Sequence, residues 1–170
     1  MNKQRTINIP HNNPEYKSNF ISLHLLLSSI ENSEMQILRI ELDKEKSDIK
    51  TLFADIQFFL ITVSNIQKMM LRLRKLFRKD KDYMIFYKKY IKEIEYLDSF
   101  RDNLEHFDER LDGRGKKGKS LSQPNMLGNL FGDEYNFGGE TFNLKNAFSL
   151  VKELKKDLIE WNRINYQFPL

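Results

Sequence analysis

The chain has 170 residues, of which 40% are hydrophobic and 31% charged, which suits one domain with one apolar core and excludes wholesale disorder. It contains no cysteine, which excludes disulfide scaffolds, thiolate metal sites and cysteine nucleophiles, and its 7 glycines and 4 prolines are too localised for a β-sandwich or barrel. The formal net charge is only +4, but the charges are unevenly distributed along the chain.

The N-terminal part of the sequence predicts a flexible arm followed by a long helix. Residues 1–13 form the arm, and Asn13-Pro14 places a proline at the first position of a helix. Apolar residues with helical spacing extend this first helix over about 14–44: Phe20, Leu23, Leu27, Ile30, Leu38 and Leu42. Residues 35–42 also alternate between apolar and polar side chains, so a strand is an alternative there.

The second helix has the clearest pattern. Between positions 49 and 77, apolar residues recur at alternating spacings of three and four, which makes four heptads of a and d positions: Ile49, Leu52, Ile56, Phe59, Val63, Ile66, Met70, Leu73 and Phe77. Ser47 is the expected N-cap. Such a helix would be about 45 Å long, which is typical of a helical bundle.

The rest of the chain predicts two more helices around a glycine-rich insert. The third helix covers about 82–112, with Gly113 ending it; residues 113–142 hold all 7 glycines and form a structured loop, with a small β-hairpin within 127–142. Asn143 caps a fourth helix over about 144–161. The predicted fold is therefore all-α, an antiparallel four-helix bundle in a single domain over 14–170, with the insert between helices 3 and 4.

Two basic zones stand on either side of an acidic one. Residues 68–92 carry ten Lys or Arg against two Asp, a net charge of +8, and residues 93–112 carry eight acids against two Arg, a net charge of −6. Four cations follow with no acid between them: Arg114, Lys116, Lys117 and Lys119. The basic zones could hold a polyanion such as RNA, although the plainer interpretation of the first zone is a solvated helix face.

Several common sites are not predicted. Residues 113–120 match the phosphate-loop pattern G-x-x-x-x-G-K-[ST], but an acidic amphipathic segment precedes them where a strand is required. The three histidines are scattered without H-E-x-x-H or Glu-x-x-His spacing, so we expect no metal and no cofactor. The polar N-terminus and the short apolar runs predict neither a signal peptide nor a membrane span, which favours a cytoplasmic protein without a membrane partner.

One constellation on the third helix could carry chemistry. Arg101 lies about 100° to one side of the apolar stripe that contains Phe100, and His106 lies about 120° to the other side. Asp102 and His106 are i, i+4 neighbours, so the carboxylate can orient the imidazole. A neutral His can take the proton of a ribose 2′-hydroxyl while an Arg stabilises the charge on the attacked phosphate, and this pair therefore suits cleavage of RNA without a metal.

The segment Arg101-Asp-Asn-Leu-Glu-His106 resembles the signature of the HEPN superfamily, in which an Arg and a polar residue precede a His by a few positions. The wider stretch up to Gly113 is similar to uncharacterised bacterial proteins of this type. The resemblance implies an all-α bundle, a homodimer that brings two motifs together, and in many members a metal-independent endoribonuclease. Arg101, His106 and Asp102 would then be catalytic, and Arg114, Lys116, Lys117 and Lys119 would steer the RNA.

The alternative is a non-catalytic helical adaptor or regulatory subunit. In this interpretation the basic end of helices 2 and 3, or the glycine-rich loop, binds a macromolecular partner, which is RNA or a protein. His106 is then an exposed helix residue, and Arg101 pairs with Glu105 or Asp98 on its own helix.

Overall fold

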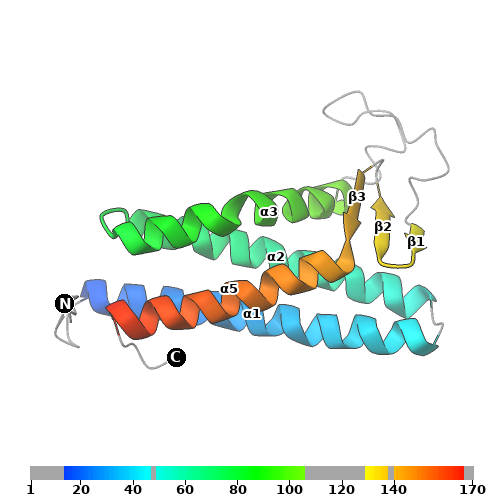
Figure 1. Ribbon diagram of the computed structural model, residues 1–170, viewed down its shortest axis with the longest axis horizontal. Helices are drawn as coiled ribbons and strands as arrows, with labels where there is room; N and C mark the ends of the chain where they lie inside the picture. Colours follow the sequence, from blue (N-terminus) through cyan, green and yellow to red (C-terminus); the bar gives the residue numbers. More distant parts are fainter. Residues whose placement is uncertain (1–13, 47–48, 106–128, 138–139, 167–170) are drawn as a thin grey trace.

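The computed structural model describes residues 14–46, 49–105, 129–137 and 140–166. Within these ranges the chain forms four long helices and one small sheet (Figure 1). The helices are α1 (Pro14–Lys46), α2 (Ile49–Leu76), α3 (Lys81–Glu105) and α5 (Leu144–Asn165). The predicted all-α bundle with an insert between its last two helices is confirmed.

Helix α1 runs without interruption through residues 35–42, so the strand alternative for that segment is wrong. The alternation there comes from two helical stripes on one helix. Ile37 and Ile40 are buried in the core, while Met35, Leu38 and Leu42 are exposed on other sides of the helix. Helix α5 continues to Asn165, beyond the predicted end at 161. The predicted arm, the N-cap Ser47 and residues 106–112 of the predicted third helix lie outside the described residues.

Successive helices are antiparallel neighbours, and the fourth closes the bundle against the first (Figure 1). The hydroxyl of Ser33 on α1 donates to Thr62 Oγ1 on α2 at 2.7 Å. Lys155 Nζ on α5 lies 2.6 Å from Glu34 Oε2 on α1. These polar contacts at the helix junctions fix how the helices lie against one another around the apolar interior.

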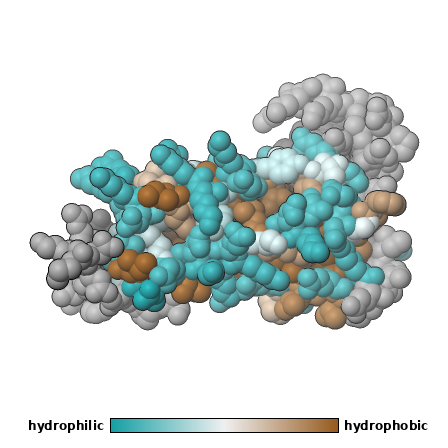
Figure 2. Space-filling model, viewed as in Figure 1, coloured by the Kyte–Doolittle hydropathy of each residue, from teal (hydrophilic) through white to brown (hydrophobic). Residues whose placement is uncertain are grey.

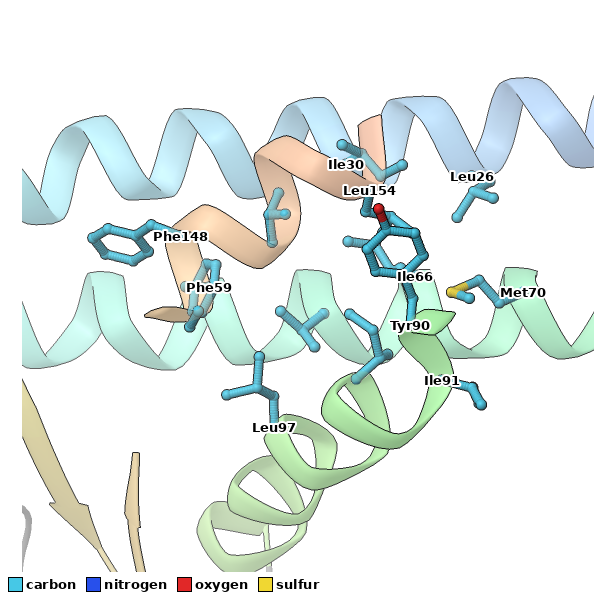
Figure 3. Packing of buried hydrophobic residues seen from close by; sticks show 14 of the residues in the cluster. Leu26, Ile30, Phe59, Ile66, Met70, Tyr90, Ile91, Leu97, Phe148 and Leu154 are labelled. Carbon is cyan, nitrogen blue, oxygen red and sulfur yellow. The ribbon is translucent and has the colours of Figure 1, made fainter. Parts of the chain in front are cut away.

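The core runs along the whole bundle. Every predicted heptad residue of α2 from Leu52 to Phe77 is buried, which confirms the face that the spacing assigned to the interior. Phe59 meets Phe148 of α5 edge to face, with ring centroids 5.5 Å apart. Figure 3 shows these two rings with Leu97 and Leu154 converging from different helices on one interior.

A three-stranded antiparallel sheet in the order β1 (Asn129–Phe131), β2 (Glu134–Phe137) and β3 (Glu140–Asn143) covers one end of the bundle. The predicted hairpin is confirmed and has a third strand. Gly132 has a φ of 61° at the turn between β1 and β2, a conformation that suits glycine. Tyr135 and Phe142 are both buried, with ring centroids 5.3 Å apart. Phe53 of α2 packs against Tyr135, with ring centroids 5.8 Å apart, and this contact joins the sheet to the bundle.

Helix α5 begins directly after β3. The side chain of Asn143 accepts a hydrogen bond from the backbone N–H of Asn146 at 3.0 Å, which confirms the predicted cap. None of the helices in the described part of the chain is both long enough and apolar enough to cross a membrane.

Candidate functional site

The C-terminal end of α3 is held by the sheet. The hydroxyl of Tyr96 donates to the carbonyl oxygen of Thr141, and Ser99 Oγ lies 3.3 Å from Glu140 Oε2. Phe100 is fully buried, and its ring centroid is 4.7 Å from that of Phe142. These contacts fix the helix turn that carries the predicted catalytic arginine.

Arg101 is held between two carboxylates of its own helix. Its Nε donates to Asp98 Oδ1 at 3.2 Å, and its Nη2 donates to Asp102 Oδ1. The Arg101 side chain is only 17% exposed. A phosphate at this position would have to compete with Asp98 and Asp102 for the guanidinium, so the arrangement favours a positioned ion pair over a free anion-binding group.

The structure brings together two of the predicted catalytic residues, Arg101 and Asp102. The Asp102 carboxylate faces Arg101. The other predicted site residues lie outside the described part of the chain: His106, Arg114, Lys116, Lys117 and Lys119. The expected contact between Asp102 and His106 and the segment that matches a phosphate loop are outside it as well. Arg101 was predicted either to act in catalysis or to pair with Glu105 or Asp98 on its own helix. The described contacts include the ion pair with Asp98.

A second cluster of charge lies at the opposite end of the bundle, where α2 turns into α3 (Figure 1). On α2, exposed cations recur at spacings of four and three, which places Lys68, Arg72 and Lys75 on one face, and Lys79 follows four residues later in the turn. Arg78, Lys81, Lys88 and Lys92 are exposed around the same turn and along α3. About 30 Å of helix separates Lys81 from Arg101.

Most of these cations have no carboxylate partner among the described residues. Arg72 Nε donates to Ser22 Oγ at 2.9 Å, Arg74 stacks 5.2 Å over the Tyr87 ring, and Lys89 pairs with Asp157. Seven others form no ion pair with any described residue, and we call them the basic end: Lys68, Lys75, Arg78, Lys79, Lys81, Lys88 and Lys92. Their charge is therefore available to a ligand.

Asp80, at the centre of this zone, does not neutralise the basic end. Its Oδ1 accepts a hydrogen bond from the backbone N–H of Tyr83 at 2.9 Å and so caps α3. Its Oδ2 accepts from the hydroxyl of Tyr166 at 2.9 Å. Burial and the neighbouring Asp80 raise the pKa of Tyr166, so this hydroxyl remains a donor. Asp80 ties the start of α3 to the chain after α5.

A hollow of about 340 Å³ opens at this turn. It is lined by Arg78, Lys79, Asp80, Lys81, Met84, Ile85 and Lys88. Ile85 is 68% exposed, so the hollow combines four cations with an apolar wall. In Figure 2 this end, at the upper left, is mostly hydrophilic with a small hydrophobic patch. Such a lining suits an anionic group that carries a flat or apolar moiety.

The distribution of charge along the sequence predicted a basic zone but not its geometry. The apolar wall and the structural use of Asp80 need the fold, because they depend on a turn between two helices. The spacing of four, three and four from Lys68 to Lys79 is visible in the sequence and is the signal that could have located this cationic surface.

Comparison of the chain with protein-family models, with curated proteins and with solved structures finds no match in any of the three. The assignment of a function therefore depends on the residues described above.

Proposed function

We propose that the protein is a non-catalytic helical module that binds single-stranded RNA through the basic end. The observation that carries this proposal is the set of seven exposed cations without carboxylate partners in the described chain, four of which line a hollow together with Asp80 and two apolar residues. An RNA strand supplies the matching chemistry, because each phosphate it places near a Lys or Arg releases condensed counterions.

A single strand fits this surface better than a duplex. Met84 and Ile85 form an apolar wall beside the cations, and an unstacked base can pack against such a wall while its phosphate contacts Lys81 or Lys88. In a duplex the bases are stacked inside the helix and cannot reach the wall.

Fluorescence anisotropy with a labelled uridine 20-mer between 50 and 200 mM salt tests this proposal. Removing one cation that neutralises a phosphate of a single strand lowers the slope of log K against log salt by about 0.7, which is about fivefold in affinity at 0.1 M salt. The double variant Lys81→Gln/Lys88→Gln should therefore bind about 25-fold more weakly, with a slope lower by about 1.4. Lys152→Gln/Lys156→Gln on α5 removes the same charge elsewhere and is the matched control.

Two results would contradict the proposal. One is an equal loss of affinity in the α5 control and the basic-end variant, because RNA binding would then depend on net charge and not on the basic end. The other is equally tight binding of polyglutamate of the same charge, which would replace RNA by an acidic protein as the partner.

A metal-independent endoribonuclease at Arg101 and His106 is the second candidate function. The position of Arg101 favours it: the residue lies on the third helix of an antiparallel four-helix bundle beside the buried Phe100, as the HEPN resemblance implies. Catalysis would require Arg101 to exchange Asp98 or Asp102 for a phosphate of the RNA.

Cleavage of labelled RNA in EDTA separates the two candidates. If the enzyme proposal holds, His106→Ala should lower the rate by on the order of a hundredfold, the loss expected for a general base. Arg163→Ala is a matched control for Arg101→Ala, because Arg163 forms the same kind of i, i+3 pair, with Glu160. Absence of cleavage, or a His106→Ala variant as fast as the parent, would reject the nuclease and leave the binding function intact.

A further inference from the structure

Helix α1 carries a second stripe of residues on the side away from the core. Its members follow one another at alternating spacings of four and three: Ile21, Leu25, Ser28, Asn32, Met35, Arg39 and Leu42. All of these residues are exposed, and the large apolar ones are 48–56% exposed. A 3.5-residue repeat on the solvent side is the pattern of a helix that packs against a further helix.

Helix α2 repeats this pattern. Ala54, Phe58, Ile61 and Asn65 follow one another at spacings of four, three and four, and all are exposed. Phe58 is 54% exposed and Ile61 45% exposed. The same stripe then continues into Lys68 and Arg72, so the apolar half of this face ends where the cationic face of α2 begins.

The two stripes belong to one surface. Arg39, within the α1 stripe, reaches across to α2, where its Nη1 lies 3.9 Å from Asp55 Oδ1. Arg72, at the end of the α2 stripe, reaches back to α1 and donates to Ser22. Because these contacts cross the α1–α2 junction near both ends of the stripes, the stripes lie side by side along the hairpin. We call this surface the outer seam.

The outer seam differs from the other faces of the bundle in charge. Residues 18–30 and 56–67 contain no Asp, Glu, Lys or Arg. Among described side chains, eight of the ten exposed residues of α3 are charged, and six of the ten on α5. Solvated helix faces have the composition of α3 and α5, whereas depletion of charge together with exposed large apolar residues marks a face that a partner covers.

We propose that the outer seam is the interface of a two-fold homodimer. A seam with one charged member, Arg39, needs a complement with few charges, and the exposed residues of α3 and α5 are mostly charged. Among the described residues the seam itself offers such a complement, and a two-fold axis places the same surface on both copies. Asn32 and Asn65 supply the polar positions that set register in such helix pairs.

The size of the outer seam suits a stable dimer. From residue 21 to residue 42 the α1 stripe rises about 33 Å, and from residue 54 to residue 65 the α2 stripe rises about 17 Å. Each helix is about 10 Å wide. Pairing would therefore bury about 500 Å² on each copy, or about 1,000 Å² in total, which is the size that a specific interface should reach. This surface is distinct from the α3 face around Arg101.

Light-scattering mass measurements between 1 and 100 µM test the interface. The parent chain should have twice its 20.4 kDa monomer mass. Phe58→Glu places a charge at the middle of the seam and should raise the dissociation constant about a hundredfold. Ile159→Glu is the matched control, because Ile159 is a similarly exposed apolar residue on α5 and should leave the dimer intact.

Circular dichroism checks that both variants fold. We expect that they do, because Phe58 and Ile159 are both half exposed in the monomer. A parent chain that remains monomeric at 100 µM would overturn the proposal. A Phe58→Glu variant that still dimerises as the parent does would also overturn it and would place the contact on another face.

Discussion

Tyr90 and Asp157 form a polar contact between α3 and α5 whose contribution to stability can be worked out. The Tyr90 hydroxyl donates to Asp157 Oδ2 at 2.6 Å, and Lys89 Nζ lies 2.7 Å from the same oxygen. The Tyr90 side chain is buried, and burial raises the pKa of Tyr90 to about 12, so the hydroxyl remains a donor at neutral pH. Tyr90→Phe removes this donor and keeps the ring.

The expected destabilisation is about 1.5 kcal/mol, the lower end of the range for a hydrogen bond to a charged group, because Asp157 keeps Lys89 and is partly open to water. With an unfolding entropy of about 2.1 cal/mol/K per residue, the melting temperature of a chain of 170 residues should fall by about 4 °C. Urea and thermal unfolding followed by circular dichroism at pH 7 measure the two quantities.

The difference in stability between the parent and Tyr90→Phe should depend on pH because of Asp157. Lys89, and then Tyr90, lower the pKa of Asp157 by hydrogen bonding to its carboxylate. The resulting stability is complete above the ordinary Asp value of about 3.9 and is lost as the pH falls through the lowered folded value. The gap between parent and Tyr90→Phe should therefore narrow below about pH 3.

Tyr87→Phe is the control, since Tyr87 is also buried and its hydroxyl has no hydrogen bond to another described residue. Equal destabilisation by the two substitutions, or a gap for Tyr90→Phe that is unchanged at about pH 2.5, would refute the reasoning.

Two further substitutions test the core and Asp55, which is one of two buried carboxylates among the described residues. Burial and a hydrogen bond with Asp43 raise the pKa of Asp55, so its contribution to stability is present below the ordinary Asp value and is lost as pH rises through the raised one. Asp55→Asn should therefore raise the melting temperature by about 2–4 °C at pH 7 but not at pH 3.5; a fall at pH 7 would contradict this. Phe59→Ala empties a fully buried site against Phe148 and should cost about 3–5 kcal/mol in urea unfolding, and a cost below about 1 kcal/mol would argue against this packing.

The accuracy of the sequence-based fold prediction followed the clarity of the apolar pattern. On α2 the buried residues recur at one spacing from Leu52 to Phe77, so the face and the length were predicted correctly. On α1 the outer seam adds a second apolar stripe. Because the exposed Met35 and the buried Ile37 belong to different stripes but lie two positions apart, the sequence there alternates like that of a strand. The third strand was missed because β3 is only four residues long and runs directly into α5.

For the candidate site, the sequence predicted contacts within one helix but not contacts between distant segments. The sequence located Arg101 and offered Asp98 as one of its partners, a pairing that depends only on i, i+3 spacing. The hollow at the α2–α3 turn is lined by residues that are close in the chain, but its shape depends on how the two helices meet. Tyr166 contacts Asp80 from 86 residues away, and short-range spacing does not predict such a contact.

The way in which α5 closes the bundle has a consequence for the order of folding. Helices α1, α2 and α3 are sequence neighbours joined by short connections, so their contacts require little loop-closure entropy. Helix α5 reaches α1 only through long-range contacts such as Lys155 with Glu34, which are 121 residues apart. We therefore expect a three-helix nucleus on which α5 docks late, so that weakening its contacts speeds unfolding more than it slows folding. Amide hydrogens of α5 should then exchange through partial openings that leave the α1–α2 hairpin protected.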